Sequence, residues 1–143
     1  MQIRPLSDRY AVSPQISPEH VAEIAAAGYT TVINNRPDGE NPPELSAEEL
    51  RAAVEAAGLR FVDNPFNPMT FSAAHVDAQR AAIDSDGGRV LAYCASGNRS
   101  SIAWALAMAG RSPADDLIAA AARHGYQLEG LRPQLEAATS TRG

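Results

Sequence analysis

The sequence predicts a single α/β domain with a mostly parallel central sheet flanked by helices. Short β-prone runs alternate with alanine-rich helical runs along the chain, which is typical of βαβ units. The chain has 143 residues, the length of one ordinary domain, and no repeat, low-complexity tract or linker divides it. Hydrophobic residues make up 45% and charged residues 20%, a composition typical of globular proteins. We therefore expect one domain over residues 1–143.

The first third of the chain is expected to hold two short strands, a helix and a third strand. Residues 2–6 and Tyr10–Ser13 are predicted to be edge strands. A helix over 17–28 has Ser, Pro and Glu at its start and Gly at its end, and each of these residues favours that position. The β-branched run 30–34 predicts a strand, and the prolines and glycine of 35–43 predict a loop.

Capping and breaker residues locate the remaining elements. A capping box formed by Ser46 and Glu49 starts a second helix. The expected elements are a helix over 47–57, a strand over 59–63, a loop over 64–70, a helix over 72–84, a turn at 86–88, a strand over 89–93 and helices over 100–109, 112–123 and within 131–138. Ligands of parallel sheets bind at the carboxyl ends of the strands, so the loops 35–43, 64–70 and 94–99 are predicted to form the site.

Charge and cysteine content exclude several classes of protein. The net charge is −5 and the isoelectric point is near 5.1, so the chain lacks the basic footprint of a nucleic-acid-binding protein. We expect the partner to be a small molecule or another protein instead. The single cysteine excludes an intrachain disulfide and multi-cysteine zinc modules.

The sequence also predicts location and cofactor use. The first residues lack the apolar run of a signal peptide, and the least polar stretch, 100–110, is too short to cross a bilayer. We expect a cytoplasmic protein without membrane contact. His20, His75 and His124 fall on three different predicted helices without ligand spacing, and no dinucleotide or nucleotide-binding motif is present. No metal and no cofactor are therefore expected.

The residues expected to carry chemistry follow the strand 89–93. The chain runs through Cys94, the loop residues Ala95, Ser96, Gly97 and Asn98, then Arg99 and Ser100 at the start of an uncharged helix. A thiol that faces a helix N-terminus and a guanidinium is favoured in its thiolate form. Inward-pointing loop amides bind an anion, and the helix dipole reinforces them.

The residues at the end of this loop each have a physical role in such a site. Gly97 permits a turn that a Cβ would obstruct, and Arg99 can hold two oxygens of a tetrahedral anion. Ser100 can donate to the thiolate or assist its release as a leaving group. The alternative interpretation is a buried core cysteine beside a solvated arginine. The ordered combination of strand, Cys, Gly, Arg, Ser and uncharged helix favours a reactive cysteine.

Two motifs in order carry a family resemblance. The run Tyr93-Cys94-x-Ser96-Gly97-x-Arg99-Ser100, with Val32-Ile33-Asn34-Asn35-Arg36-Pro37-Asp38-Gly39-Glu40, resembles the phosphatase-like domain of the beta-lactamase hydrolase-like proteins. That family is similar to the dual-specificity, tyrosine-phosphatase-like fold. The resemblance covers residues 1 to about 111, leaving a helical C-terminal part over 112–143. It implies Cys94 as nucleophile and Arg99 as the anion-binding residue.

The chain departs from ordinary tyrosine-type phosphatases in two ways. Four residues separate Cys94 and Arg99, one fewer than in those enzymes. Many rhodaneses have this four-residue spacing, and the run Cys-x-Ser-Gly-Asn-Arg-Ser of this chain resembles a rhodanese loop. The loop that supplies their general acid corresponds to Asp63 and the residues after it, and Asp63 is its one acidic residue. Its alternative role is that of a turn or capping residue.

The 35–43 loop offers the other candidate side chains. Asp38 and Glu40 are alternative acids if this loop folds over the pocket; otherwise they form a Pro-Asp-Gly turn and a solvated carboxylate. Asp38 and Arg36 are also candidates for substrate binding, although an ion pair of Arg36 within the loop would serve to hold it instead.

Three functions remain open from the sequence. The first is a phosphatase-like hydrolase in which the Cys94 thiolate attacks a small phosphorylated substrate. The second is a rhodanese-type sulfurtransferase that carries a persulfide on Cys94 and takes sulfane sulfur from a small donor. The third is a non-catalytic module that binds an oxyanion.

Overall fold

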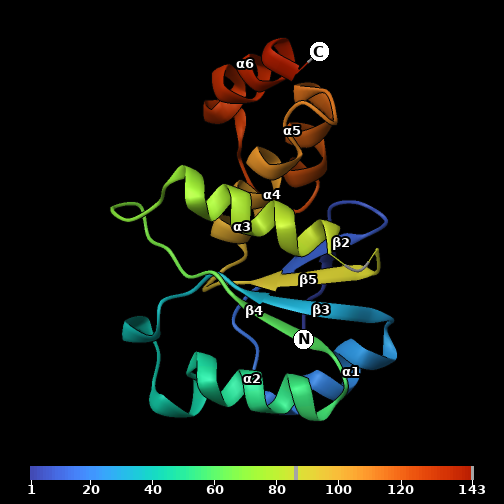
Figure 1. The fold of residues 1–143 in the computed structure, drawn as a ribbon, viewed down its shortest axis with the longest axis vertical. Coiled ribbons are helices and arrows are strands. Elements are labelled where there is room, and N and C mark those ends of the chain that lie inside the picture. Colours follow the sequence, from blue (N-terminus) through green and yellow to red (C-terminus); the bar gives the residue numbers. More distant parts are fainter. Residues whose placement is uncertain (86, 143) are drawn as a thin grey trace.

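Five strands form one sheet in the order β1-β2-β5-β3-β4 (Figure 1). The computed structural model describes residues 1–85 and 87–142. The strands are β1 (Arg4–Pro5), β2 (Tyr10–Ser13), β3 (Tyr29–Asn34), β4 (Arg60–Asp63) and β5 (Arg89–Tyr93). All neighbouring strands are parallel except β1, which runs antiparallel to β2. The predicted single α/β domain with a mostly parallel sheet is confirmed.

Helices cover both faces of the sheet. They are α1 (Val21–Ala26), α2 (Ala47–Ala56), α3 (Ala73–Asp84), α4 (Asn98–Met108), α5 (Ala114–Ala122) and α6 (Arg132–Arg142), with short 3-10 turns η1 (Pro18–His20), η2 (Asp38–Glu40), η3 (Pro43–Leu45) and η4 (Glu129–Leu131). Figure 1 shows α1 and α2 on one face, α3 and α4 on the other, and α5 and α6 stacked beyond α4. From β2 onward, a helix connects each strand to the next strand in the chain, which allows the strands to run parallel.

The hydrophobic core has one part on each face of the sheet. Along the central strand β5, Leu91 and Tyr93 pack toward α1 and α2, whereas Val90 and Ala92 pack toward α3 and α4. All four are buried, since a strand covered on both faces alternates its side chains between two cores. The second core also takes in side chains from α5 and α6, including Leu135.

The structure corrects the predicted place of Tyr10–Ser13. This strand is not an edge strand: β2 lies between β1 and β5, and its four residues are buried. Its second neighbour, β5, comes about eighty residues later in the chain and pairs Tyr10 with Val90. Local composition carries no information on such a distant partner.

Several element ends differ from the prediction. Helix α4 starts at Asn98 rather than at residue 100, so Arg99 belongs to its first turn. Helix α6 extends to Arg142, beyond the expected limit of 138. Asp86, in the predicted turn, lies outside the described residues.

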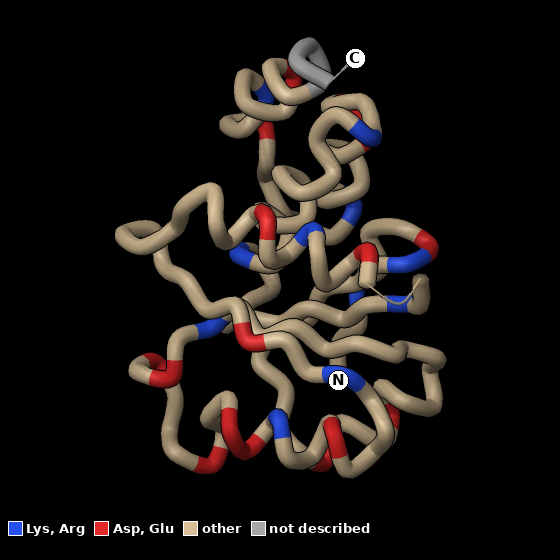
Figure 2. The backbone as a smooth tube through the Cα atoms, in the orientation of Figure 1, with Lys and Arg blue, Asp and Glu red and all other residues tan. Residues whose placement is uncertain are grey.

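The carboxyl ends of β3, β4 and β5 lie at one edge of the sheet, from which the loops 35–43, 64–70 and 94–99 emerge. Figure 2 shows acidic residues gathered on α2 and on the segment that leads into it. Over residues 1–85 and 87–142, no helix has the length and apolarity needed to cross a membrane.

Candidate active site

The loop between β5 and α4 brings a backbone amide onto the cysteine sulfur. Cys94 follows β5 directly and is fully buried. Gly97 is the N-cap of α4, and its N–H donates to Sγ of Cys94 over 3.1 Å. The sulfur therefore lies at the positive end of an eleven-residue helix with an amide directed at it, the geometry that favours a thiolate or a bound anion.

Gly97 is a position that a side chain could not occupy. Its φ is +95°, in the left-handed region that L-residues rarely adopt. A Cβ built there would overlap the hydroxyl of Tyr126. The role expected for this glycine, a turn without a Cβ, fits this geometry.

Arg99 joins the three loops at the carboxyl edge of the sheet. Its Nη1 donates to Oε2 of Glu40 over 2.8 Å and its Nη2 donates to Oε1 over 2.7 Å. Nη1 also donates to the carbonyl oxygen of Phe66 over 3.1 Å. The predicted meeting of 35–43, 64–70 and 94–99 is therefore observed in these contacts.

The pairing with Arg99 controls the charge of Glu40. Hydrogen bonds from Arg99, with the charges of Arg99 and Arg36, hold the pKa of Glu40 below its ordinary value despite partial desolvation. In return, the Glu40 hydrogen bonds raise the pKa of Arg99, and the proximity of Cys94 adds to that rise. Glu40 is thus an ionised partner of Arg99, not the freely solvated carboxylate expected as an alternative.

Arg36 and Asp38 serve to shape the 35–43 loop. Arg36 donates from Nε to Oε1 of Glu40 over 3.3 Å, from Nη2 to the Glu40 carbonyl over 3.0 Å and from Nη1 to Gln15 over 3.3 Å. Asp38 accepts the N–H of Ala47 over 2.7 Å and so satisfies a free donor at the start of α2. These contacts favour the loop-holding role for Arg36 and the turn role for Asp38.

Asp63 lies at the end of β4 on the side of the sheet that carries α1 and α2. Asn34 pairs in register with both Asp63 and Tyr93, so the three side chains share a row across the sheet. Oδ1 of Asp63 accepts from Nδ2 of Asn34 over 2.9 Å. Burial raises the pKa of Tyr93, and the negative charge of Asp63 adds to that shift. The hydrogen bond to Asn34 at the end of the strands favours the role of Asp63 as a turn or capping residue.

Ser100 bonds to a buried polar cluster rather than to the cysteine. Its hydroxyl donates to Oδ1 of Asn35 over 2.9 Å. Behind it, Gln79 accepts from Asn35 and Asn64 and donates to the hydroxyl of Tyr10. All five side chains are buried, so their hydrogen bonds fix the base of the loop firmly.

The sequence interpretation missed this cluster. A signal was present in Gln79, a glutamine on the apolar face of α3 alongside Ala82 and Ile83. A buried glutamine implies several polar partners, since unpaired buried amides are costly. Burial also raises the pKa of Tyr10 and outweighs the opposing effect of the Gln79 hydrogen bond, so its hydroxyl stays protonated.

The remaining loop residues face outward. Ala95, Ser96 and Asn98 are exposed. The carbonyl of Ala95 accepts from the N–H of Gln15 over 3.3 Å, and the carbonyl of Ser96 accepts from the hydroxyl of Tyr126 over 2.8 Å. Nothing in the sequence signalled Tyr126, which lies thirty positions after Ser96.

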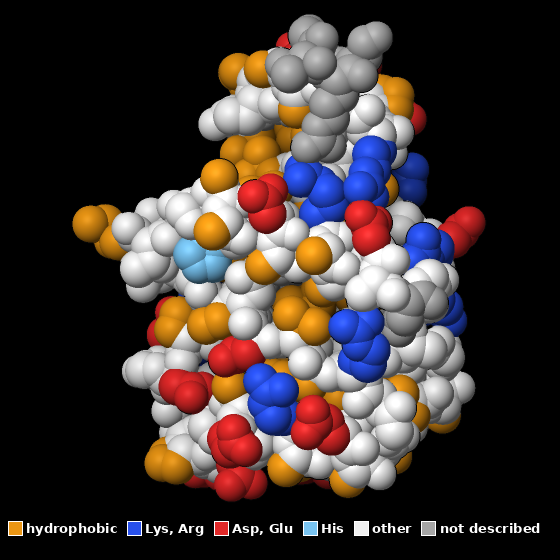
Figure 3. Space-filling view, viewed as in Figure 1, with side chains coloured by type: hydrophobic (Ala, Val, Ile, Leu, Met, Phe, Trp, Pro, Cys, Tyr) orange, Lys and Arg blue, Asp and Glu red, His pale blue; other side chains and the backbone are white. Residues whose placement is uncertain are grey.

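The loop between β4 and α3 forms an apolar rim beside this site. It projects from the molecule in Figure 1, and a hydrophobic tip is visible there in Figure 3. Met69 in this loop is 92% exposed, while the tilted rings of Phe66 and Phe71 pack with their centroids 4.6 Å apart. Because the carbonyl oxygen of Phe66 also accepts from Arg99, the rim is attached directly to that arginine.

Comparisons with known proteins agree with this geometry. The model of the family described as beta-lactamase hydrolase-like protein, phosphatase-like domain, matches residues 2–111. The beta-lactamase hydrolase-like protein of Xylella fastidiosa (strain Temecula1 / ATCC 700964) is 33% identical over 130 residues, which cover 90% of this chain and 30% of that protein. The chain therefore spans about 30% of the length of the curated relatives it matches.

Solved structures share the fold. The crystal structure of a protein from Neisseria meningitidis Z2491 that is classed as a phosphatase has 31% sequence identity and a TM-score of 0.81, covering 96% of this chain and 99% of that one. Tk-PTP in its active form has 19% identity and a TM-score of 0.73, covering 98% of this chain and 95% of its own. The fold is thus similar to that of tyrosine-phosphatase-like proteins.

Proposed function

The chain belongs to the phosphatase-like domain family of the beta-lactamase hydrolase-like proteins, and from this premise we propose that it is a cysteine-dependent phosphatase acting on a small phosphorylated substrate. Membership and fold make it a phosphatase-like hydrolase. The finer statement concerns the nucleophile, Cys94, and the residues that assist it.

The proposed reaction has two steps. The Cys94 thiolate attacks phosphorus, a Cys–S–P bond forms, and the bond to the leaving oxygen breaks with its electron pair on that oxygen. The loop amides and Arg99 stabilise the charge that develops on the other phosphoryl oxygens. Water then attacks the phosphocysteine, releases inorganic phosphate and restores the thiolate.

One observation carries the proposal: a backbone amide at the N-terminus of a helix points at a buried sulfur. Gly97 N–H lies 3.1 Å from Sγ of Cys94, and Arg99 lies in the first turn of the same helix. An inert core cysteine does not need this arrangement. An amide and a helix N-terminus directed at one sulfur support a site for a thiolate and a tetrahedral anion.

The carboxylates around the loop favour substrates with good leaving groups. Glu40 is the carboxylate in contact with Arg99, and its lowered pKa keeps it ionised at neutral pH, so it has no proton to donate. Asp63 and Asp38 are bonded to Asn34 and Ala47. Aryl phosphates, whose leaving oxygen departs without a strong acid, are the substrate class that fits, and the apolar rim at Met69 suits an aryl group.

Hydrolysis of para-nitrophenyl phosphate tests the proposal. Cys94→Ser abolishes turnover, and Arg99→Lys lowers kcat/KM by about 10²–10³-fold because the planar two-donor grip is lost. Arg111→Lys is the matched control, since Arg111 makes the same bidentate pairing with Asp84, at 2.8 Å for both bonds, outside the loop. Turnover that survives Cys94→Ser would overturn the proposal.

Sulfur transfer is the second candidate, favoured by the four-residue spacing between Cys94 and Arg99 and by the ionised state of Glu40. The thiolate would attack the outer sulfur of thiosulfate, the S–S bond would break, and sulfite would leave with the electron pair. The resulting persulfide would pass its sulfur to a thiol or cyanide. This reaction requires no general acid, because its leaving group is stable as an anion.

Intact-mass spectrometry after brief exposure to thiosulfate separates the two candidates. A gain of one sulfur atom by the parent chain, absent from Cys94→Ser, would favour sulfur transfer. No gain, together with aryl phosphate turnover, supports the phosphatase. Saturable phosphate binding without turnover of either substrate would instead support the non-catalytic oxyanion-binding module.

A further inference from the structure

The peptide group between Ser96 and Gly97 is held from both sides. Its carbonyl oxygen accepts from the hydroxyl of Tyr126 over 2.8 Å, and its N–H donates to Sγ of Cys94 over 3.1 Å. The carbonyl and the N–H belong to one planar, trans unit and point in opposite directions. A group that fixes the carbonyl therefore also fixes the direction of the N–H.

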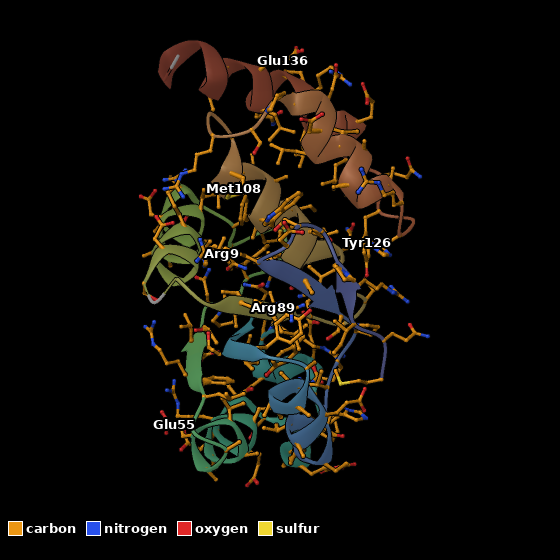
Figure 4. All side chains as sticks on the ribbon, turned by 90° about the vertical axis from the view of Figure 1, so that its right-hand side faces the viewer. Arg9, Glu55, Arg89, Met108, Tyr126 and Glu136 are labelled. Carbon is orange, nitrogen blue, oxygen red and sulfur yellow. The ribbon has the colours of Figure 1, made fainter. Side chains whose placement is uncertain are left out.

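Tyr126 is well placed to fix that carbonyl. It is buried, and Nη1 of Arg4 donates to its hydroxyl oxygen over 2.7 Å, which leaves the hydroxyl proton for Ser96. The guanidinium of Arg4 also lies 5.7 Å from the ring centroid. Figure 4 labels Tyr126 beside β1 and β2, below the C-terminal helices. The residue follows α5 and lies beyond residue 111, where the family match ends.

Because residue 97 is a glycine, the orientation of the Ser96–Gly97 peptide has to be fixed by a group outside the loop. With φ at +95° and no Cβ, glycine imposes little preference of its own on the peptide that precedes it. If this peptide turned over, the carbonyl oxygen of Ser96 would face the sulfur in place of the N–H and would repel a thiolate. The missing Cβ is also what allows the Tyr126 hydroxyl to approach the loop.

We propose that Tyr126 is a positioning residue that holds the Ser96–Gly97 peptide with its N–H directed at Cys94, and thereby stabilises the thiolate. Arg4 acts through Tyr126 by orienting its hydroxyl. The proposal deepens the proposed function, on which it rests for its biological meaning, because it identifies how the C-terminal segment prepares the nucleophile.

The test is a pH titration of the ultraviolet absorbance of the thiolate, made below the pH at which tyrosines ionise, about 10. In that range the signal reports on Cys94 alone, because the chain has one cysteine. Tyr126→Phe removes only a hydroxyl. At a pH on the rising part of the titration, it lowers the ratio of thiolate to thiol about three- to tenfold, since part of a hydrogen bond to a charged group is lost. Arg4→Met changes the ratio in the same direction by less.

Tyr29→Phe is the matched control. The guanidinium of Arg89 lies 4.5 Å from the Tyr29 ring centroid and donates to its hydroxyl over 3.4 Å, so the pair resembles Arg4 and Tyr126. Tyr29 starts β3, at the opposite end of the strands from the loop. Its titration curve is expected to match that of the parent chain.

An unchanged titration in both Tyr126→Phe and Arg4→Met, with melting temperatures near that of the parent, would overturn the proposal. Because the titration needs no turnover, its outcome is separate from that of the proposed function. A shifted curve in a chain that hydrolyses no phosphate would keep the role of Tyr126 and reject the phosphatase. Phosphate turnover with an unshifted curve would reject the role of Tyr126 alone.

Discussion

At the scale of single residues, the pairing of Glu40 with Arg99 joins the 35–43 loop to the first turn of α4. Two N–H groups of the guanidinium meet two carboxylate oxygens at 2.7 and 2.8 Å, a fork geometry that fixes the guanidinium plane. The Phe66 carbonyl adds a third bond. The orientation of the Arg99 guanidinium is therefore fixed by Glu40 and Phe66.

Glu40→Gln is expected to flatten the acid dependence of stability. The native pKa of Glu40 lies below the ordinary value of 4.5, so the native state binds fewer protons than the unfolded state. The stabilisation is full above pH 4.5 and is lost as pH falls through the lowered pKa. Thermal melts across this window show the difference between parent and variant narrowing as pH falls.

Glu44→Gln serves as the control for that series. Glu44 lies in the same loop region but is exposed, so the variant should follow the parent at every pH. A difference between Glu40→Gln and the parent that stays constant from pH 7 into the acid range would contradict the assigned pairing.

Asp63→Asn is expected to slow good and poor leaving groups equally. Because Asp63 is bonded to Asn34 and lies in the row of Tyr93, we expect that it does not protonate the leaving oxygen. The measurement is the ratio of kcat/KM for para-nitrophenyl phosphate to that for phenyl phosphate, which should stay within about twofold of the parent ratio. A selective loss with phenyl phosphate would instead make Asp63 the general acid.

At the scale of elements, the sequence predicted what depends on local chemistry. The order of strands and helices follows from capping residues and β-branched runs, and the meeting of three loops follows from parallel topology. The role of Glu40 was not predictable, because it depends on the loop closing onto Arg99. The same holds for β2 and for Tyr126, whose partners are distant in the chain and known only once the whole sheet is assembled.

Gln79→Leu is expected to destabilise the protein strongly through the buried cluster. The change leaves the amides of Asn35 and Asn64 and the Tyr10 hydroxyl short of a partner. The free energy of unfolding should fall by about 2–4 kcal/mol, since each unsatisfied buried group costs about 1–3 kcal/mol. Urea denaturation measures the loss.

A control on another helix isolates that effect. Gln134→Leu places the same change at an exposed position of α6, where surface substitutions stay within about 0.5 kcal/mol. Equal stabilities of the Gln79 and Gln134 variants would show that the cluster does not support the fold.

At the scale of the whole molecule, the C-terminal segment is part of the same core as the active-site helix. Leu117, Tyr126, Leu128 and Leu135 lie in one cluster with Trp104 of α4. The family match ends at residue 111, yet packing continues beyond it. The chain should therefore unfold as one unit.

Two leucine-to-alanine substitutions, one on each side of the sheet, test whether the chain unfolds as one unit. Leu50 in α2 and Leu135 in α6 are both fully buried, in different halves of the core. Leu50→Ala and Leu135→Ala should each lower the melting temperature by about 5–15 °C, as a loss of about 2–5 kcal/mol implies. Calorimetry should show a single transition in both variants. Two separate transitions, only one of them shifted by Leu135→Ala, would contradict a single folding unit.

The central claim is that Cys94 forms a covalent bond to phosphorus, and the most direct measurement is the intact mass of enzyme quenched in acid during turnover of para-nitrophenyl phosphate. The account predicts a species heavier by one phosphoryl group, located on the peptide that contains Cys94 and absent from Cys94→Ser. Steady turnover with no such species on Cys94 at any quench time would contradict it.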